Sequence, residues 1–235
     1  MILTPKKLSV VVPVFNEKNT ISEIISRISS APSNELEKEI IVVDDFSTDG
    51  TREILKNLNQ NSKVKIAFHE KNQGKGASLR TGFNMVTGDI IIVQDADLEY
   101  DPKEYPIMLG PILEHKADVV FGSRFHAGPR RALLFWHYFG NLLLTFLSNL
   151  LNNLNLSDME TCYKMFTRQV LENIQIHSDR FGFEPEFTAK VAKKNWRIYE
   201  VPISYNGRSY AEGKKISWKD GILAIFAIIW FRFFD

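Results

Sequence analysis

Residues 89–97 read Asp-Ile-Ile-Ile-Val-Gln-Asp-Ala-Asp, so that four aliphatic residues run into two closely spaced aspartates. A short apolar run between turn residues is typical of a strand that is buried on both faces. Residues i and i+2 of a strand point to the same side, so Asp95 and Asp97 leave the strand together. Such a carboxylate pair suits a hard divalent cation that is shared with the phosphates of a substrate.

The first half of the chain alternates between strand-like and helix-like segments. Short, Val- and Ile-rich runs predict strands at Leu8–Val14, Glu39–Val43, Val64–Phe68, Asp89–Gln94 and Asp118–Phe121. Helical spacing of apolar residues or a preceding turn predicts helices at Thr20–Ser29, Thr51–Leu58 and Gly76–Val86. Alternating strands and helices indicate an α/β protein with right-handed crossovers and a mostly parallel sheet.

Acidic residues follow three of these predicted strands. They lie in Pro13-Val-Phe-Asn-Glu17, Asp44-Asp45-Phe-Ser47 and Asp95-Ala-Asp97. In open α/β sheets, ligands bind beyond the carboxyl ends of the strands. The three segments are therefore expected to converge on one ligand site at this edge of the sheet.

Composition limits the kind of protein that this is. The 235 residues are 44% hydrophobic and 24% charged, which suits one globular domain. Residues 1–117 carry 14 basic and 17 acidic side chains, and residues 118–235 carry 15 and 11. Neither half has the dense basic stripe of a nucleic-acid-binding protein. The single cysteine, Cys162, is expected to be a buried thiol in a reducing cytoplasm. Neither a secretory signal nor a membrane span of about 20 apolar residues is expected.

Several common ligand sites are excluded by the loops at this edge. The first strand runs into Pro13–Glu17 and not into G-x-G-x-x-G, which argues against a dinucleotide site. The segment Asn72–Gly76 lacks the spacing of a P-loop, and no G-x-S-x-G elbow is present. What remains is a site whose carboxylates could bind sugar hydroxyls and the edge of a nucleobase, together with a pair of carboxylates for a metal ion on a diphosphate. Such a site indicates a nucleotide-sugar.

Five motifs occur in the order and spacing of a known family. They are Val12-Pro-Val-Phe-Asn-Glu17, Val42-Val-Asp-Asp-Phe-Ser47, Asn72-Gln-Gly-Lys-Gly76, Asp95-Ala-Asp97 and Gly122-Ser-Arg124. The chain resembles the family-2 inverting glycosyltransferases, and among them the dolichol-phosphate mannose synthases and bacterial polyprenyl-phosphate glycosyltransferases. The resemblance implies a GT-A-type, Rossmann-like sheet flanked by helices, with acceptor-side helices near the C-terminus.

The resemblance also implies roles for single residues. Pro13, Phe15, Glu17, Val43 and Asp45 would surround the nucleoside, with Asp45 accepting a hydrogen bond from the base. The other donor-binding positions would be Lys75, Asp95, Ala96, Asp97, Arg124, Arg208 and Lys214. Mg²⁺ or Mn²⁺ would be held by Asp95, Asp97 and Glu99, where Glu99 replaces a glutamine common in the mannose synthases.

The second half resembles the acceptor side of these enzymes. Residues 1–121 would form the nucleotide-sugar half of a single domain and residues 122–235 the acceptor half. A strand at Tyr199–Tyr205 would lead into a cationic loop, Asn206–Lys215, which closes over phosphates. The expected catalytic residues are Asp97, Arg124, Asp158 and Glu186.

The implied reaction transfers a hexose from GDP-mannose or a UDP-sugar to a polyprenyl or dolichyl phosphate. Such a phosphate is already an anion at pH 7 and requires no strong base. A hydroxyl acceptor on a surface glycan would require one, and Asp158, Glu160 and Glu186 are then candidates. A non-catalytic nucleotide-sugar-binding module stays open as an alternative, whereas a sugar nucleotidyltransferase would need a glycine-rich first loop. The five histidines receive no role.

The most apolar part of the chain is Ala132–Leu156, which follows Arg130 and Arg131. Asn141, Asn149, Asn152 and Asn153 interrupt it too often for a membrane-spanning helix, and the pattern suits a helix at a membrane interface or against the core. Residues 221–234 are also apolar, but a helix of this length covers only about 21 Å. We expect a cytoplasmic protein at the inner face of the membrane; a membrane-protein partner or a homo-oligomer stays open.

Overall fold

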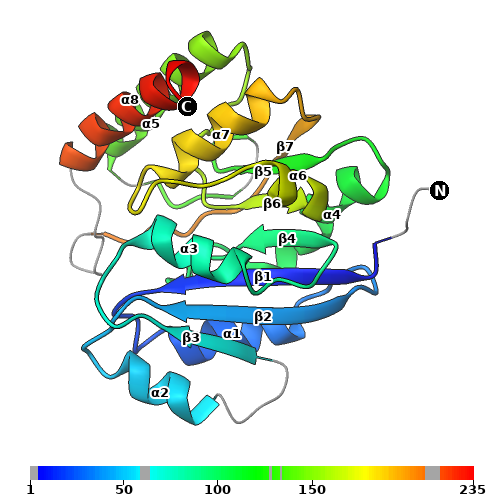
Figure 1. The fold of residues 1–235 in the computed structure, drawn as a ribbon, viewed down its shortest axis with the longest axis vertical. Coiled ribbons are helices and arrows are strands. Elements are labelled where there is room, and N and C mark those ends of the chain that lie inside the picture. Colours follow the sequence, from blue (N-terminus) through cyan, green and yellow to red (C-terminus); the bar gives the residue numbers. More distant parts are fainter. Residues whose placement is uncertain (1–4, 59–63, 127–128, 133, 210–217) are drawn as a thin grey trace.

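The computed structural model describes residues 5–58, 64–126, 129–132, 134–209 and 218–235. Its centre is a seven-stranded sheet in the order β3-β2-β1-β4-β6-β5-β7 (Figure 1). The strands are β1 (Lys7–Val14), β2 (Glu37–Asp44), β3 (Val64–Phe68), β4 (Ile90–Val93), β5 (Val119–Ser123), β6 (Lys164–Thr167) and β7 (Ile198–Pro202). The helices are α1 (Ile21–Ser30), α2 (Thr51–Leu58), α3 (Lys75–Phe83), the short 3₁₀ helix η1 (Pro102–Glu104), α4 (Tyr105–Leu113), α5 (Phe135–Asn152), α6 (Arg168–Asn173), α7 (Phe183–Lys193) and α8 (Trp218–Phe233).

The sheet is mostly parallel, which confirms the predicted fold class. Strand β1 pairs in parallel with β2 and β4, β2 with β3, and β5 with β7. Strand β6, which the sequence did not predict, lies antiparallel between β4 and β5. Because β6 runs in the opposite direction, the residues that precede it reach the carboxyl ends of its two neighbours.

The predicted apolar runs form the core. All four residues of β4 are fully buried, as are Val10, Val11 and Val12 of β1, and α1 buries its four isoleucines. Helix α3 packs closely on the sheet at Gly82, where an added Cβ would lie 2.4 Å from Cγ1 of Val11. Any larger residue at position 82 would therefore push α3 away from β1.

Three helices gather beyond the β5–β7 side of the sheet. Figure 1 shows α8 (red) beside α5 (green), with α7 between them and the sheet, and all three contact one another. Helices α5 and α8 correspond to the two apolar segments noted in the sequence. None of the helices in the described ranges combines the length and the hydropathy that a membrane crossing requires.

A buried carboxylate connects neighbouring segments of the sheet at the end opposite to the acidic segments. Glu39 of β2 is 5% exposed and accepts hydrogen bonds from Ser9 Oγ at 2.5 Å, Thr87 Oγ1 at 2.8 Å, Gly88 N at 3.1 Å and Lys65 Nζ at 2.9 Å. Burial alone would raise the pKa of Glu39. The hydrogen bonds outweigh burial and lower the pKa to about 2.

We expect Glu39→Gln to lower the free energy of unfolding at pH 7 by about 2–3 kcal/mol, because it breaks a buried charged network. The pKa of Glu39 is about 2 in the folded protein, against 4.5 ordinarily. Its stabilising contribution is therefore complete above pH 4.5 and is lost as the pH falls through about 2.

Urea denaturation at pH 7 and pH 3 checks this prediction. The difference between Glu39→Gln and the unmutated protein should narrow at pH 3. Glu37 on the same strand is exposed, so Glu37→Gln is a matched control with little effect. A loss of equal size at both pH values would contradict the assignment.

Candidate active site

A cavity of about 940 Å³ opens at the carboxyl ends of β1, β2 and β4. This is the edge where the three acidic segments were expected to converge. The predicted residues that line it are Pro13, Phe15, Glu17, Asp45, Lys75, Asp95, Ala96, Asp97, Glu99, Arg124 and Arg208. Val43, Asp158 and Glu186 are not among the lining residues, and Lys214 lies outside the described residues.

Asp95 and Asp97 leave the end of β4 into this cavity, as predicted. Lys75 Nζ lies 3.0 Å from Asp95, and Arg208 Nη2 lies 3.0 Å from Asp97. Burial raises the pKa of Asp97 to about 7, and the negative charges of Asp95 and Glu99 add to the effect although Arg208 opposes it. An oxygen-donor pair with excess negative charge fits a hard divalent cation.

Glu99 is directed differently from the two aspartates. Its Oε2 accepts a hydrogen bond from the Tyr205 hydroxyl at 2.6 Å, and its Oε1 accepts one from the backbone N–H of Arg208 at 2.8 Å. In the described part of the chain, Asp95, Asp97 and Glu99 do not bring one oxygen each within 4.8 Å of one another. The structure therefore ties Glu99, the third predicted metal ligand, to the segment after β7.

Arg208 connects the two halves of the chain across the cavity. Its guanidinium lies 3.3 Å from Glu17, 3.0 Å from Asp97 and 3.4 Å from Glu99. These carboxylates follow β1 and β4, whereas Arg208 follows β7. The residue that was predicted to contact phosphate thus stands among the acidic groups that a cation and a diphosphate would meet.

Asp45 organises the loop before α3. Its carboxylate accepts hydrogen bonds from the backbone N–H groups of Gln73 at 2.8 Å and Gly74 at 2.7 Å. The ring of His69 contacts Asp45 through Nδ1 at 2.8 Å and Thr81 Oγ1 through Nε2 at 2.9 Å. Sequence reasoning gave His69 no role, because its partners are distant in the chain and form no recognisable spacing.

Lys75, at the start of α3, joins two acidic residues on the cavity wall. Its Nζ lies 3.0 Å from both Asp95 and Glu184. Burial would lower the pKa of Lys75, but Asp95 and Glu184 hold it well above its usual range. Glu184 was missed in the sequence, where Glu186, two residues further along the same segment, was chosen.

Glu186, a predicted catalytic residue, does not line the cavity. It is fully buried in α7 and accepts hydrogen bonds from the backbone N–H groups of His177 at 2.6 Å and Ser178 at 2.7 Å. Lys190 Nζ lies 2.7 Å from it. Its carboxylate therefore holds the loop before α7 in place.

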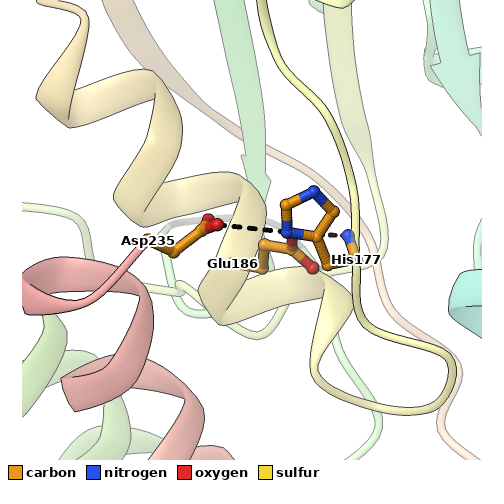
Figure 2. Close-up of side chains that lie close together, drawn as sticks. All are labelled: His177, Glu186 and Asp235. Carbon is orange, nitrogen blue, oxygen red and sulfur yellow. Dashed lines mark hydrogen bonds and ion pairs between the residues drawn. The ribbon is translucent and has the colours of Figure 1, made fainter.

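Figure 2 shows that Asp235, beyond α8, joins the same cluster. Its carboxylate lies 3.1 Å from His177 Nδ1 and 2.5 Å from Lys190 Nζ. His177, Glu186 and Asp235 bring ligand-type atoms within 4.8 Å of one another. Because the Lys190 ammonium already supplies the positive charge, the cluster links α8 to α7 and does not present a cation site.

Arg124 and Asp158 form a buried ion pair beside the cavity. Arg124 Nε lies 2.6 Å from Asp158 Oδ2 and Nη2 lies 2.7 Å from Oδ1, and Asp158 is fully buried. Burial would lower the pKa of Arg124, but Asp158 holds it well above its usual range. Arg124 and Asp158, two of the four predicted catalytic residues, are thus paired with each other. Of the three carboxylates considered as bases, Glu160 is the one that lines the cavity.

A family model described as Glycosyl transferase family 2 matches residues 9–175. The chain belongs to glycosyl transferase family 2. It is 28% identical over 213 residues to a dolichol-phosphate mannosyltransferase from Pyrococcus furiosus, covering 88% of this chain and 59% of that protein. It is 25% identical over 211 residues to a dodecaprenyl-phosphate galacturonate synthase from Rhizobium johnstonii, covering 88% and 61%. The chain thus spans about three-fifths of the length of these family-2 relatives.

Solved structures confirm the GT-A-type fold. The glucosyl-3-phosphoglycerate synthase of Mycobacterium tuberculosis, in complex with Mn²⁺, UDP and phosphoglyceric acid, superposes with a TM-score of 0.75 at 20% identity. The match covers 98% of this chain and 80% of that one. The same enzyme with Mn²⁺, UDP-glucose and phosphoglyceric acid gives 0.76 at 20% identity, covering 97% and 79%.

Proposed function

We propose that this family-2 protein transfers a hexose from a nucleotide-sugar to a polyprenyl phosphate with inversion at the anomeric carbon. The observation that carries the proposal is the convergence of Asp95, Asp97, Lys75 and Arg208 on one cavity at the end of β4. The names of the two relatives, one a dolichol-phosphate and the other a dodecaprenyl-phosphate enzyme, support this choice of acceptor.

Asp95 and Asp97 would hold the Mg²⁺ or Mn²⁺ that family 2 implies. When bound, the cation would offset the charge that develops on the departing nucleoside diphosphate. Arg208 and Lys75 place positive charge beside the same two carboxylates and would help to neutralise the diphosphate. The nucleoside itself would contact Pro13, Phe15 and Glu17, which lie at or just after the end of β1, on one side. On the other side it would contact the loop that Asp45 holds.

A lipid phosphate as acceptor agrees with how the acidic residues are used. The carboxylate of Asp158 pairs with Arg124. The carboxylate of Glu186 pairs with Lys190 and accepts hydrogen bonds from two backbone N–H groups. Neither carboxylate lines the cavity, so neither stands where it could accept a proton from an incoming hydroxyl. An acceptor that is already an anion removes the need for such a base.

The acceptor would approach over an exposed apolar surface on α5 and α8, which we call the α5–α8 face. Its side chains are between 38% and 78% exposed. They are Phe135, Trp136, Phe139, Leu142, Leu143, Phe146 and Leu150 on α5, and Ile222, Leu223, Phe226, Ile229, Trp230 and Phe233 on α8. The same two helices line the cavity through Trp136, Gly140, Gly221 and Ala224. An apolar face of this extent at the cavity mouth fits peripheral docking on the inner face of a membrane.

Substituting aspartate for Trp136 and Phe226 together should reduce binding to phosphatidylglycerol vesicles at least about tenfold, because charges would enter the apolar layer. Co-sedimentation at low salt measures the effect. Ile107 on α4 is 43% exposed but lies elsewhere, so Ile107→Asp is the matched control and should bind as before. Equal binding by all three proteins would contradict docking through the α5–α8 face and would favour a protein partner or a second copy there.

A donor screen tests the proposed reaction. The protein is incubated with Mg²⁺ or Mn²⁺, a short polyprenyl phosphate, and GDP-mannose, UDP-glucose or UDP-GlcNAc in turn. Mass spectrometry should detect a lipid-linked sugar with one of the donors. Binding of nucleotide without any lipid product would overturn the lipid-phosphate proposal and favour a hydroxyl acceptor or a non-catalytic module.

A further inference from the structure

One carboxyl group on the cavity wall has an unpaired buried oxygen. Glu160 lines the cavity, and its Oε1 is buried without a hydrogen-bond partner among the described residues. Buried polar atoms in folded proteins are nearly always paired, so each exception requires an explanation. At the wall of a substrate cavity, the simplest explanation is that a ligand supplies the partner.

The other carboxylates nearby are already engaged. Lys75 contacts Asp95 and Glu184, and Arg208 contacts Asp97 and Glu99. Glu160 forms no comparable ion pair with any described residue. It therefore stands out among the acidic residues of the cavity as one whose polar contacts are not provided by the protein.

Lys164, four residues after Glu160, is used for another purpose. Lys164 is fully buried, and its Nζ donates to the backbone carbonyls of Met159, at 2.9 Å, and Thr161. The ammonium also lies 4.8 Å from the centre of the Phe121 ring. Lys164 thus fixes the turn that carries Glu160 and does not form an ion pair with it.

Burial raises the pKa of Glu160 to about 8, and the charge of Glu184 adds to the effect, although Lys164 and Arg124 oppose it. The shift favours the protonated form of the carboxyl group. A protonated carboxyl offers both an O–H donor and acceptor oxygens, which suits a hydroxyl group. Because the protonated form is favoured, Glu160 suits a hydrogen bond to a hydroxyl group better than the role of a base.

The position of Glu160 follows from the direction of β6. Because β6 is antiparallel to β4 and β5, the residues before Lys164 reach the carboxyl ends of those strands. Strand β4 is the one that delivers Asp95 and Asp97. The hexose of a nucleotide-sugar is attached to the diphosphate, so it would lie next to the groups that bind the diphosphate. Glu160 lines the same cavity as those groups.

We propose that Glu160 forms a hydrogen bond with a hydroxyl of the transferred hexose and thereby contributes to the choice of sugar. The inference rests on the proposed function, because it requires a nucleotide-sugar in the cavity. It assigns Glu160 to the sugar and not to the nucleoside, the diphosphate or the acceptor.

Calorimetric binding separates these parts of the ligand. UDP, UDP-glucose, GDP and GDP-mannose are titrated with Mg²⁺ into the unmutated protein, Glu160→Leu and Glu160→Gln. Glu160→Leu should weaken the binding of the nucleotide-sugar about tenfold and change that of the matching nucleoside diphosphate less than about twofold. Glu160→Gln keeps a donor and an acceptor in the same shape, so it should restore most of the affinity. Glu172→Leu, on the exposed side of α6, is the control and should bind as the unmutated protein does.

Three results would overturn the inference. Equal weakening of UDP and UDP-glucose by Glu160→Leu would show a structural role. Equal loss in Glu160→Gln and Glu160→Leu would show that a charge matters. Unchanged sugar binding in Glu160→Leu would show no contact. The assay contains no acceptor, so a protein that passes it but transfers no sugar to polyprenyl phosphate would overturn the proposed function alone.

Discussion

Asp97→Ala should lower sugar transfer at least about a thousandfold while leaving the protein folded. The change removes one of the two carboxylates expected to hold the cation, and about 4 kcal/mol of transition-state stabilisation corresponds to this factor. Stability should not fall, because burial and the charges of Asp95 and Glu99 already disfavour the ionised Asp97, as its raised pKa of about 7 shows. The measurement is the rate of lipid-linked product formation at saturating metal, alongside a thermal melt.

Loss of metal binding should accompany the loss of rate. Titration of Mn²⁺ in the presence of nucleoside diphosphate should show weaker binding by Asp97→Ala than by the unmutated protein. Glu172→Ala removes a carboxylate from the exposed surface of α6 and serves as the control, with unchanged rate and metal affinity. Substantial residual transfer by Asp97→Ala with metal present would contradict the assignment of Asp97.

Arg124→Ala should lower the free energy of unfolding by about 3–5 kcal/mol, because it leaves the fully buried Asp158 without its charge partner. Asp158→Ala should cost a similar amount for the same reason. Replacing both residues by Arg124→Met and Asp158→Leu should cost clearly less than the two single changes together. Urea denaturation at pH 7 measures all three proteins.

The chain contains a matched pair for comparison. Arg197 donates through Nε at 2.9 Å and Nη2 at 2.7 Å to the two oxygens of Asp118, in the same two-pronged arrangement. The side chain of Arg197 is 55% exposed, whereas that of Arg124 is 13% exposed. Arg197→Ala should therefore cost less than about 1 kcal/mol. If Arg124→Ala and Arg197→Ala cost the same, burial does not determine the value of the pair.

The part of the fold that depends on local pattern could be predicted from the sequence. The runs Leu8–Val14 and Val64–Phe68 are rich in Val and Ile, and the observed bounds differ by at most one residue. The expectation of a strand buried on both faces fits β1, whereas β3 lies at the edge of the sheet and is half-buried throughout. The position of Asp95 and Asp97 could also be predicted, because a two-residue spacing after a strand determines their side. These features depend on neighbours in the sequence alone.

The features that could not be predicted depend on contacts between distant segments. Strand β6 begins with Lys164, which normally indicates exposure, but here the ammonium is buried against backbone carbonyls. Glu184 and Glu186 lie on one helix two residues apart, and only the packing of α7 shows which one faces the cavity. Nothing in the sequence shows that Asp158 pairs with Arg124 or that His69 contacts Asp45.

The order of the strands also constrains how this chain can fold during synthesis. Strand β5 is covered on one side by β6 and on the other by β7, which is made much later. Until Pro202 has left the ribosome, one edge of β5 has no partner and could pair with a strand of another chain. The β5–β7 contact is therefore a late, long-range closure step, and a nascent chain that pauses before Ile198 leaves this edge of β5 open to other chains.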